Sequence, residues 1–193
     1  TALQLAGPQT LLELKFTVAT RPDWTRLYLR CTWDNAARPQ VEIPLRMLGV
    51  MPMPPYSFPM RSPLLENDGD RTITCWFPMH FARHARIELE NRGPQATSVT
   101  MTYATKAGPH PGDWGYFTAV LNEGTTGTGE PFQGPRLTDC KGLLRFLMIE
   151  ECVDSTGRIP DMHLSHLEGD LCIRINGNRG DDHTFDASET GIG

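Results

Sequence analysis

The feature that most constrains the fold of this chain is a two-residue alternation of apolar and polar side chains. In the run at 11–18, Leu12, Leu14, Phe16 and Val18 alternate with charged residues and threonine. Successive side chains of a β-strand point to opposite faces, so each such run has one buried face and one solvent face. The same pattern predicts further strands at 27–33, 85–90, 98–104 and 171–175.

Turn-forming sequences separate these runs. NRGPQ, KAGPHPGD and NGNRGDD all lie between predicted strands, and the 18 glycines and 16 prolines make up about 18% of the chain, against roughly 12% in average proteins. Short connections of this kind join antiparallel neighbours and leave little room for long helices. We therefore predict an all-β fold in which two antiparallel sheets face each other as a sandwich.

Three stretches depart from the alternation. The proline-rich range 49–71 and the glycine- and threonine-rich range 122–136 are predicted to be long loops, the first of a kind that often builds a binding site. The apolar range 142–153 is predicted to be a buried strand or a short helix. The chain ends at DASETGIG without a strand or helix to anchor it, so we expect 1–193 to be a single sandwich domain from a longer protein.

Charge and composition exclude several classes of partner. The net charge is −5 and the basic residues are dispersed, which argues against nucleic acid, and no stretch approaches the roughly 20 apolar residues of a membrane span. The cysteine count is odd and no C-x-x-C spacing occurs, which argues against a disulfide framework or a zinc ribbon, so we expect small buried hydrophobic residues. These are Cys31, Cys75, Cys140, Cys152 and Cys172. With no signal peptide visible at the amino terminus, a cytoplasmic location is favoured, and a removed signal stays an alternative.

The range 163–193 concentrates the acidic residues and histidines around the predicted strand at 171–175. Glu168 and Asp170 lie where the chain enters this strand, and Glu189 lies beyond the loop that leaves it. Paired carboxylates at strand ends are what glycoside cleavage uses, one as general acid and the other as nucleophile or base. The alternative is that these acidic residues are solvated turn formers.

The histidines in this range raise a metal alternative. His163, His166 and Glu168 form a possible ligand set. However, strand residues three apart point to opposite faces, so this set would need a turn in order to converge. We therefore predict no metal site, and glycoside cleavage by two carboxylates requires no cofactor.

Trp33 and Asp34 stand at the end of a predicted strand. The indole can stack on a sugar face while the carboxylate binds sugar hydroxyls. The alternative is that Trp33 packs beneath a loop.

Several blocks together resemble a known family. LYLRCTWDN at 27–35, PQVEIPLRMLG at 39–49, YSFPM at 56–60, CWFPMHF at 75–81 and ARIELEN at 85–91 look like successive blocks of the DUF2961 family, glycoside hydrolase family 172. GYFTAVLNE, LTDCKG, LEGDLCIRING and DASET follow in that family's order. The resemblance covers roughly 24–190.

This resemblance implies a fold of two jelly-roll β-sandwiches, the second largely missing here, and assembly as trimers or multiples of trimers. It implies retaining cleavage of furanosides such as α-fructofuranosides or arabinofuranosides, with a carbohydrate as the partner molecule. The acid/base would be Glu168 in LEGDLC and the nucleophile Glu189 in DASET, 21 residues later. The substrate-binding candidates are Trp33, Asp34, Tyr56 and Asp170.

The chain also departs from the family's pattern. Where the family commonly has YFHAQWR, residues 116–122 read YFTAVLN. The competing function is therefore a non-enzymatic jelly-roll module that binds carbohydrate or serves assembly, without a carboxylate pair at reaction distance. The identity of the sugar and of the linkage is left open by the sequence.

Overall fold

The computed structural model describes residues 2–20, 24–51, 58–112, 114–124, 134 and 145–148, together with the backbone of 170–173 and 183–186. These residues fall into two compact units, Thr1–Met148 and Ile149–Gly193. Each unit is described by itself below.

In its described residues, the first unit consists of β-strands and one helical turn, α1 (Leu45–Leu48). Its strands are β1 (Ala2–Ala6), β2 (Gln9–Val18), β3 (Leu27–Trp33), β4 (Val41–Pro44), β5 (Met60–Arg61), β6 (Leu65–Asn67), β7 (Thr72–Cys75), β8 (Met79–Phe81), β9 (His84–Asn91) and β10 (Val99–Ala107). Within the described part of the chain, no helix has the length and apolar character that a membrane crossing requires.

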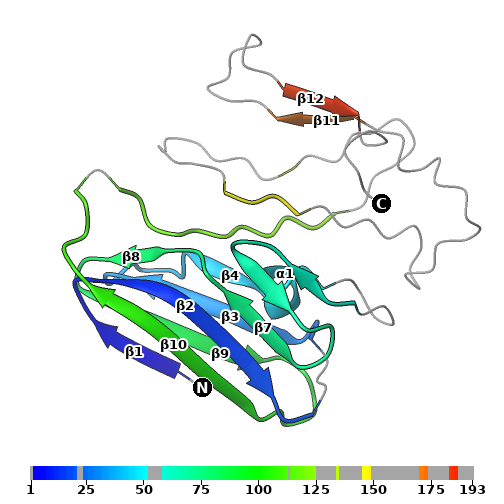
Figure 1. Ribbon diagram of the computed structural model, residues 1–193, viewed down its shortest axis with the longest axis horizontal. Helices are drawn as coiled ribbons and strands as arrows, with labels where there is room; N and C mark the ends of the chain where they lie inside the picture. The colour runs from blue at the N-terminus through cyan, green and yellow to red at the C-terminus, as the bar shows by residue number, and fades with distance from the viewer. Residues whose placement is uncertain are drawn as a thin grey trace, which may run out of the picture. The chain divides into compact units, whose positions relative to one another are not determined.

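Two antiparallel sheets make up this unit. One has the strand order β1-β9-β3-β4, and the other has the order β10-β2-β7-β6-β5, with β8 pairing with β2. Figure 1 shows the broad strands β2 and β10 lying over β3 and β9 of the other sheet. Consecutive strands often belong to different sheets, as β1 and β2 do, and this crossing between layers is typical of jelly rolls. The prediction of an all-β antiparallel sandwich of jelly-roll type is confirmed.

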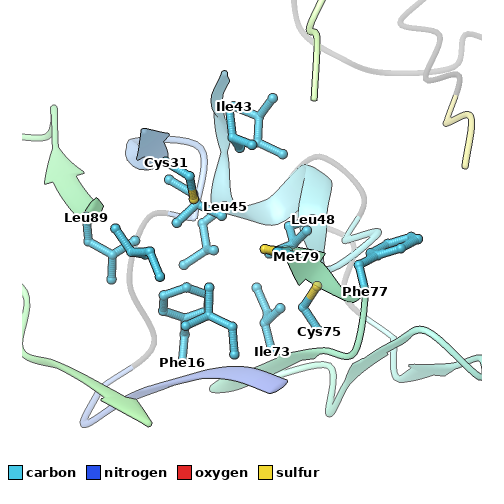
Figure 2. Packing of buried hydrophobic residues seen from close by; sticks show 14 of the residues in the cluster. Phe16, Cys31, Ile43, Leu45, Leu48, Ile73, Cys75, Phe77, Met79 and Leu89 are labelled. Atoms are coloured by element: carbon cyan, nitrogen blue, oxygen red, sulfur yellow. The ribbon is translucent and has the colours of Figure 1, made fainter. Parts of the chain in front are cut away.

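The core lies between the two sheets. Figure 2 shows Phe16 and Ile73 of one sheet facing Cys31 of the other, with Leu45 of α1 between the layers. These four residues are all completely buried. Burying them removes apolar surface from water, which is the main stabilising contribution to such a sandwich.

Cys31 and Cys75 are free thiols within this core. Burial raises the pKa of both, that of Cys75 to about 12, so both stay protonated at neutral pH. The prediction of small buried hydrophobic residues is confirmed for these two. The remaining cysteines lie outside the residues whose side chains are described.

The predicted burial of Leu12 is wrong. Its side chain is 40% exposed, while Leu11 and Leu14 are fully buried. The pairing of β2 with β10 shifts at this point: Glu13 pairs with Ala104, and Leu11 pairs with Thr105. Leu12 is thus the extra residue of a β-bulge, and such a residue breaks the regular alternation of faces.

The described part of the range 142–153 also differs from its prediction. Residues 145–148 form neither strand nor helix, and Phe146 and Leu147 are 45% and 41% exposed. The apolar composition of this segment does not translate into burial here. Phe146 contacts the sandwich through the edge of its ring against Phe77, at a centroid distance of 6.5 Å.

The predicted loop ranges are described only in part. Within 49–71, residues 60–61 and 65–67 form the short strands β5 and β6, and 52–57 lie outside the described residues. Of 122–136, only 122–124 and 134 are described. The domain boundaries stay predictions.

The second unit contains one described hairpin. β11 (Asp170–Ile173) pairs antiparallel with β12 (His183–Asp186), and Asp170 lies opposite Asp186. Sequence analysis predicted the first of these strands but not the second.

Candidate functional site

The predicted catalytic residues Glu168 and Glu189 lie outside the described residues, and so does Tyr56. Asp170 is the first residue of β11, where the backbone alone is described. The assignments of these four residues stay predictions. Trp33 and Asp34, by contrast, lie in the first unit with their surroundings fully described.

Trp33 is the last residue of β3, and its side chain is only 1% exposed. The indole Nε1 donates a hydrogen bond of 2.7 Å to the backbone oxygen of Phe117, and the ring stacks near Phe81 at a centroid distance of 6.3 Å. Trp33 therefore packs beneath the segment 114–121, as in the alternative interpretation that it packs beneath a loop. It leaves no ring face open to a sugar in this structure.

Asp34 follows Trp33 and turns the chain out of the sheet. Asp34 and Asn35 both have positive φ angles, 49° and 63°, a conformation that Asp and Asn tolerate better than most residues. This turn directs the Asp34 carboxylate at the connection between β8 and β9. It accepts backbone hydrogen bonds there from Ala82 (2.8 Å), Arg83 (2.6 Å) and His84 (2.9 Å).

Tyr116 completes the shell around this carboxylate. Its hydroxyl donates a hydrogen bond of 2.8 Å to Oδ2 of Asp34, and this bond raises the pKa of Tyr116. Burial alone would raise the pKa of Asp34, but the bonds from the three amides and from Tyr116 lower it to about 2. The carboxylate is thus ionised and its hydrogen-bonding capacity is taken up by protein groups. Asp34 acts here as an anchoring residue that holds the β8–β9 connection and Tyr116.

A cluster of rings continues from Tyr116 along the surface. Tyr116 contacts His110 at a centroid distance of 5.0 Å, and Trp114 lies edge-on against His80 of β8 at 4.4 Å. His80 and His110 approach to 6.3 Å. Trp114 and Tyr116 are 52% and 40% exposed, so the cluster forms an aromatic surface that is partly exposed to solvent.

His80 is held from the sheet side. Its Nδ1 shares a hydrogen bond of 2.6 Å with the hydroxyl of Thr10 on β2. Burial and the nearby His110 lower the pKa of His80, so it is neutral at pH 7. Among the described residues, Nε2 of His80 and Nε2 of His110 are buried without a hydrogen-bond partner.

The arrangement ties the segment 114–121 to the edge of the sandwich. Besides the Tyr116 and Trp33 bonds, the amide of Ala119 donates to the oxygen of Gln40, and Ala119 forms a parallel bridge with Val41 of β4. The block that contains YFTAVLN thus runs alongside the edge strand β4. The described residues hold no group of three His, Cys, Asp or Glu side chains placed to bind a metal ion.

Sequence analysis missed His80, His110 and Trp114. His80 lies between the apolar residues Met79 and Phe81, so its position on the opposite face could be predicted locally, although three residues are too few to identify a strand. The density of rings at 110–117 was the other available signal. The contact between these rings and His80 could not be predicted from the sequence, because the segment and β8 are about 30 residues apart.

A family model described as GH172 domain-like matches residues 3–103, which run from β1 into β10 and include Trp33, Asp34 and His80. Residues 168 and 189 lie outside the matched range. No curated protein matches the chain.

Proposed function

The chain belongs to the GH172 domain-like family, and from this premise we propose that it is a retaining glycoside hydrolase acting on furanosides, of the α-fructofuranoside or arabinofuranoside type. Family membership by itself supports a relationship to glycoside hydrolases. The substrate class and the catalytic residues are part of the proposal. Glu189 is the nucleophile and Glu168 is the acid/base.

The reaction proceeds in two displacements at the anomeric carbon. In the first, a carboxylate oxygen of Glu189 forms a bond to that carbon while the glycosidic C–O bond breaks, and the proton of Glu168 passes to the leaving oxygen. In the second, water attacks the same carbon, gives its proton to Glu168 and releases Glu189. No cofactor takes part in this scheme.

The observation that carries the proposal is the register of the β11–β12 hairpin. Asp170 pairs with Asp186, and paired strands lie about 4.8 Å apart. Glu168 precedes Asp170 by two residues, and Glu189 follows Asp186 by three. Along the sequence, both glutamates therefore adjoin the same end of the hairpin. This supports a pair whose carboxyl groups need a separation of roughly 5 to 5.5 Å.

The test is a pair of isosteric variants assayed on nitrophenyl furanosides. We expect Glu189→Gln to lose almost all turnover. Glu168→Gln keeps the first step, because the activated leaving group needs no proton, and it accumulates the glycosyl-enzyme, because water lacks its base. Added azide rescues the Glu168 variant in part, since an anion needs no deprotonation. Hydrolysis within a few fold of wild type in both variants would contradict the assignment and favour a non-enzymatic jelly-roll module.

We also propose that the chain forms a homo-oligomer, a trimer or a multiple of trimers. Large apolar side chains on the described surface support this, because such side chains favour contacts with another subunit. They include Phe58, Trp114 and Val120, each more than half exposed. Light scattering that gives only the 21.6 kDa of one chain would contradict it.

A further inference from the structure

A groove of about 290 Å³ lies on the solvent face of the sheet that contains β2, β7 and β6. It is lined by Glu13, Lys15, Glu66, Asp68, Thr72, Thr74 and Trp76. None of these residues belongs to the Asp34 and histidine cluster or to the proposed catalytic pair.

The strand register explains why these residues meet. Thr74 of β7 pairs with Lys15 of β2 on one side and with Glu66 of β6 on the other. Side chains of directly paired residues project to the same face of a sheet. Lys15 and Glu66 therefore flank Thr74, whose 6% exposure places it at the floor of the groove.

Trp76 is the unusual member of this lining. Its neighbours Cys75 and Phe77 are buried in the core, at 1% and 5% exposure, so the alternation turns Trp76 to the solvent face. The indole Nε1 donates a hydrogen bond of 3.0 Å to Oε2 of Glu13. A large ring is thus held in a fixed orientation on a face otherwise made of charged residues and threonines. This combination of an aromatic surface and polar groups favours a ligand with both apolar and hydroxyl-bearing faces.

The other side chains of the groove differ in how free they are to bind a ligand. Lys15 is exposed and forms no ion pair with any residue that the structure describes. Glu66 has Arg61 at 3.9 Å, and this arginine side chain is 80% exposed, so the contact is loose. Asp68, in contrast, accepts backbone hydrogen bonds from Asp70, Arg71 and Thr72 and shapes the groove wall. The groove thus offers an ammonium donor, carboxylate acceptors and an indole.

We propose that this groove is a carbohydrate-binding subsite that holds part of a furanose-containing oligosaccharide. Trp76 contacts the apolar face of a sugar ring, while Lys15 donates to sugar hydroxyls and Glu13 and Glu66 accept from them. The choice of furanose rests on the proposed function. The volume is near the lower end of that of small-ligand sites, which fits a short stretch of sugar rather than a long chain.

The test measures binding of two labelled probes to the full chain, an α-1,5-linked arabinofuranose tetrasaccharide and a fructofuranose tetrasaccharide. All proteins carry Glu189→Gln, so that neither probe is consumed. We expect Trp76→Ala to weaken binding of at least one probe about tenfold or more, and Lys15→Ala to weaken it several fold. Tyr103→Ala, which removes a 45% exposed ring of the same sheet outside the groove, is the matched control and leaves binding unchanged.

Trp76→Phe distinguishes the contribution of the aromatic ring from that of its hydrogen bond. It keeps an aromatic surface but loses the bond to Glu13, so we expect affinity between those of wild type and Trp76→Ala. Thermal unfolding of every variant verifies that the fold is retained. Binding of neither probe, or equal binding by the Glu189→Gln protein with and without Trp76→Ala in a folded state, would overturn the inference.

A separate assay distinguishes this inference from the proposed function. With Glu189 restored, hydrolysis of a nitrophenyl furanoside by Trp76→Ala should match wild type within about twofold, because a substrate with a single sugar ring does not need an additional subsite. If wild type hydrolyses no furanoside but binds a tetrasaccharide through Trp76, the proposed function fails and the subsite stands. If hydrolysis depends on both glutamates but no probe senses Trp76, the subsite fails and the proposed function stands.

Discussion

Asp34 owes its low pKa to backbone amides rather than to a cation. Three consecutive amides, from Ala82 to His84, point at its two oxygens. A carboxylate that accepts several amide hydrogen bonds is stabilised in its charged form. The sequence predicts a sugar ligand at Asp34 because it follows Trp33, and this stays a prediction. In this structure the hydrogen bonds of Asp34 fasten the β8–β9 connection and Tyr116 to the end of β3.

Replacing Asp34 with asparagine tests this role. Asparagine tolerates the same positive φ but removes the charge, so we expect the free energy of unfolding at pH 7 to fall by about 1 to 2 kcal/mol. The folded pKa of about 2 lies below the ordinary value near 4. The contribution of the carboxylate is therefore present above pH 4 and is lost as the pH falls toward 2. Denaturant unfolding of wild type and Asp34→Asn from pH 7 to pH 2.5 should show that the difference in their free energies of unfolding decreases.

Asp70→Asn is the matched control for this measurement. The Asp70 side chain is 56% exposed and forms a surface ion pair of 3.2 Å with Arg71. Such pairs contribute little, so we expect a change below about 0.5 kcal/mol at pH 7. An Asp34 variant as stable as this control would contradict the anchoring role.

The β6–β7 turn is fixed by side-chain hydrogen bonds to its own backbone. Asn67 accepts from the amide of Gly69, and Asp68 accepts from three amides that follow. Gly69 has φ of +76°, and a Cβ at this position would lie 2.9 Å from the backbone nitrogen of Pro59. Both observations require glycine here.

We therefore expect Gly69→Ala to lower the free energy of unfolding by about 1 kcal/mol or more, through its left-handed backbone and the close approach to Pro59. Gly108→Ala is the control, because a Cβ there would meet nothing within 4 Å. Its stability should stay within about 0.5 kcal/mol of wild type. Parallel denaturation curves decide, and equal losses in the two variants would contradict the steric argument.

At the scale of elements, the sequence predicted strands better than their pairing. The alternation at 27–33 and 85–90 matches β3 and β9 closely, because one face of each is buried throughout. The alternation did not predict the bulge at Leu12, because a bulge depends on the register between β2 and β10 and not on the sequence of β2 alone. It also missed β5 and β8, which at two and three residues are too short to show a period.

At the scale of the whole molecule, the candidate site was less predictable than the fold. Fold class follows from local alternation, and each strand carries its own signal. The Asp34 cluster instead joins residues up to 82 positions apart, and such contacts leave no local pattern. The proposed catalytic pair was found through its resemblance to a family and through its sequence spacing, and both residues lie in the unit Ile149–Gly193.

This division between the two units leads to a prediction about the fragment 1–148. Every buried hydrophobic residue that the structure describes comes from residues 5–89. The second unit's described hairpin has two strands, which is marginally stable on its own. We therefore expect the fragment to unfold cooperatively, with a midpoint within about 5 °C of that of the full chain.

The same fragment should hydrolyse no furanoside, because it lacks Glu168 and Glu189. Calorimetry measures the stability of the fragment, and the nitrophenyl furanoside assay measures its hydrolytic activity. Both are carried out on one preparation, with the full chain as the reference. A fragment that does not unfold cooperatively would show that residues 149–193 are needed for the sandwich. A fragment that keeps hydrolytic activity would show that the catalytic carboxylates lie in the first unit, where Glu13 and Glu66 of the groove would become the residues to replace first.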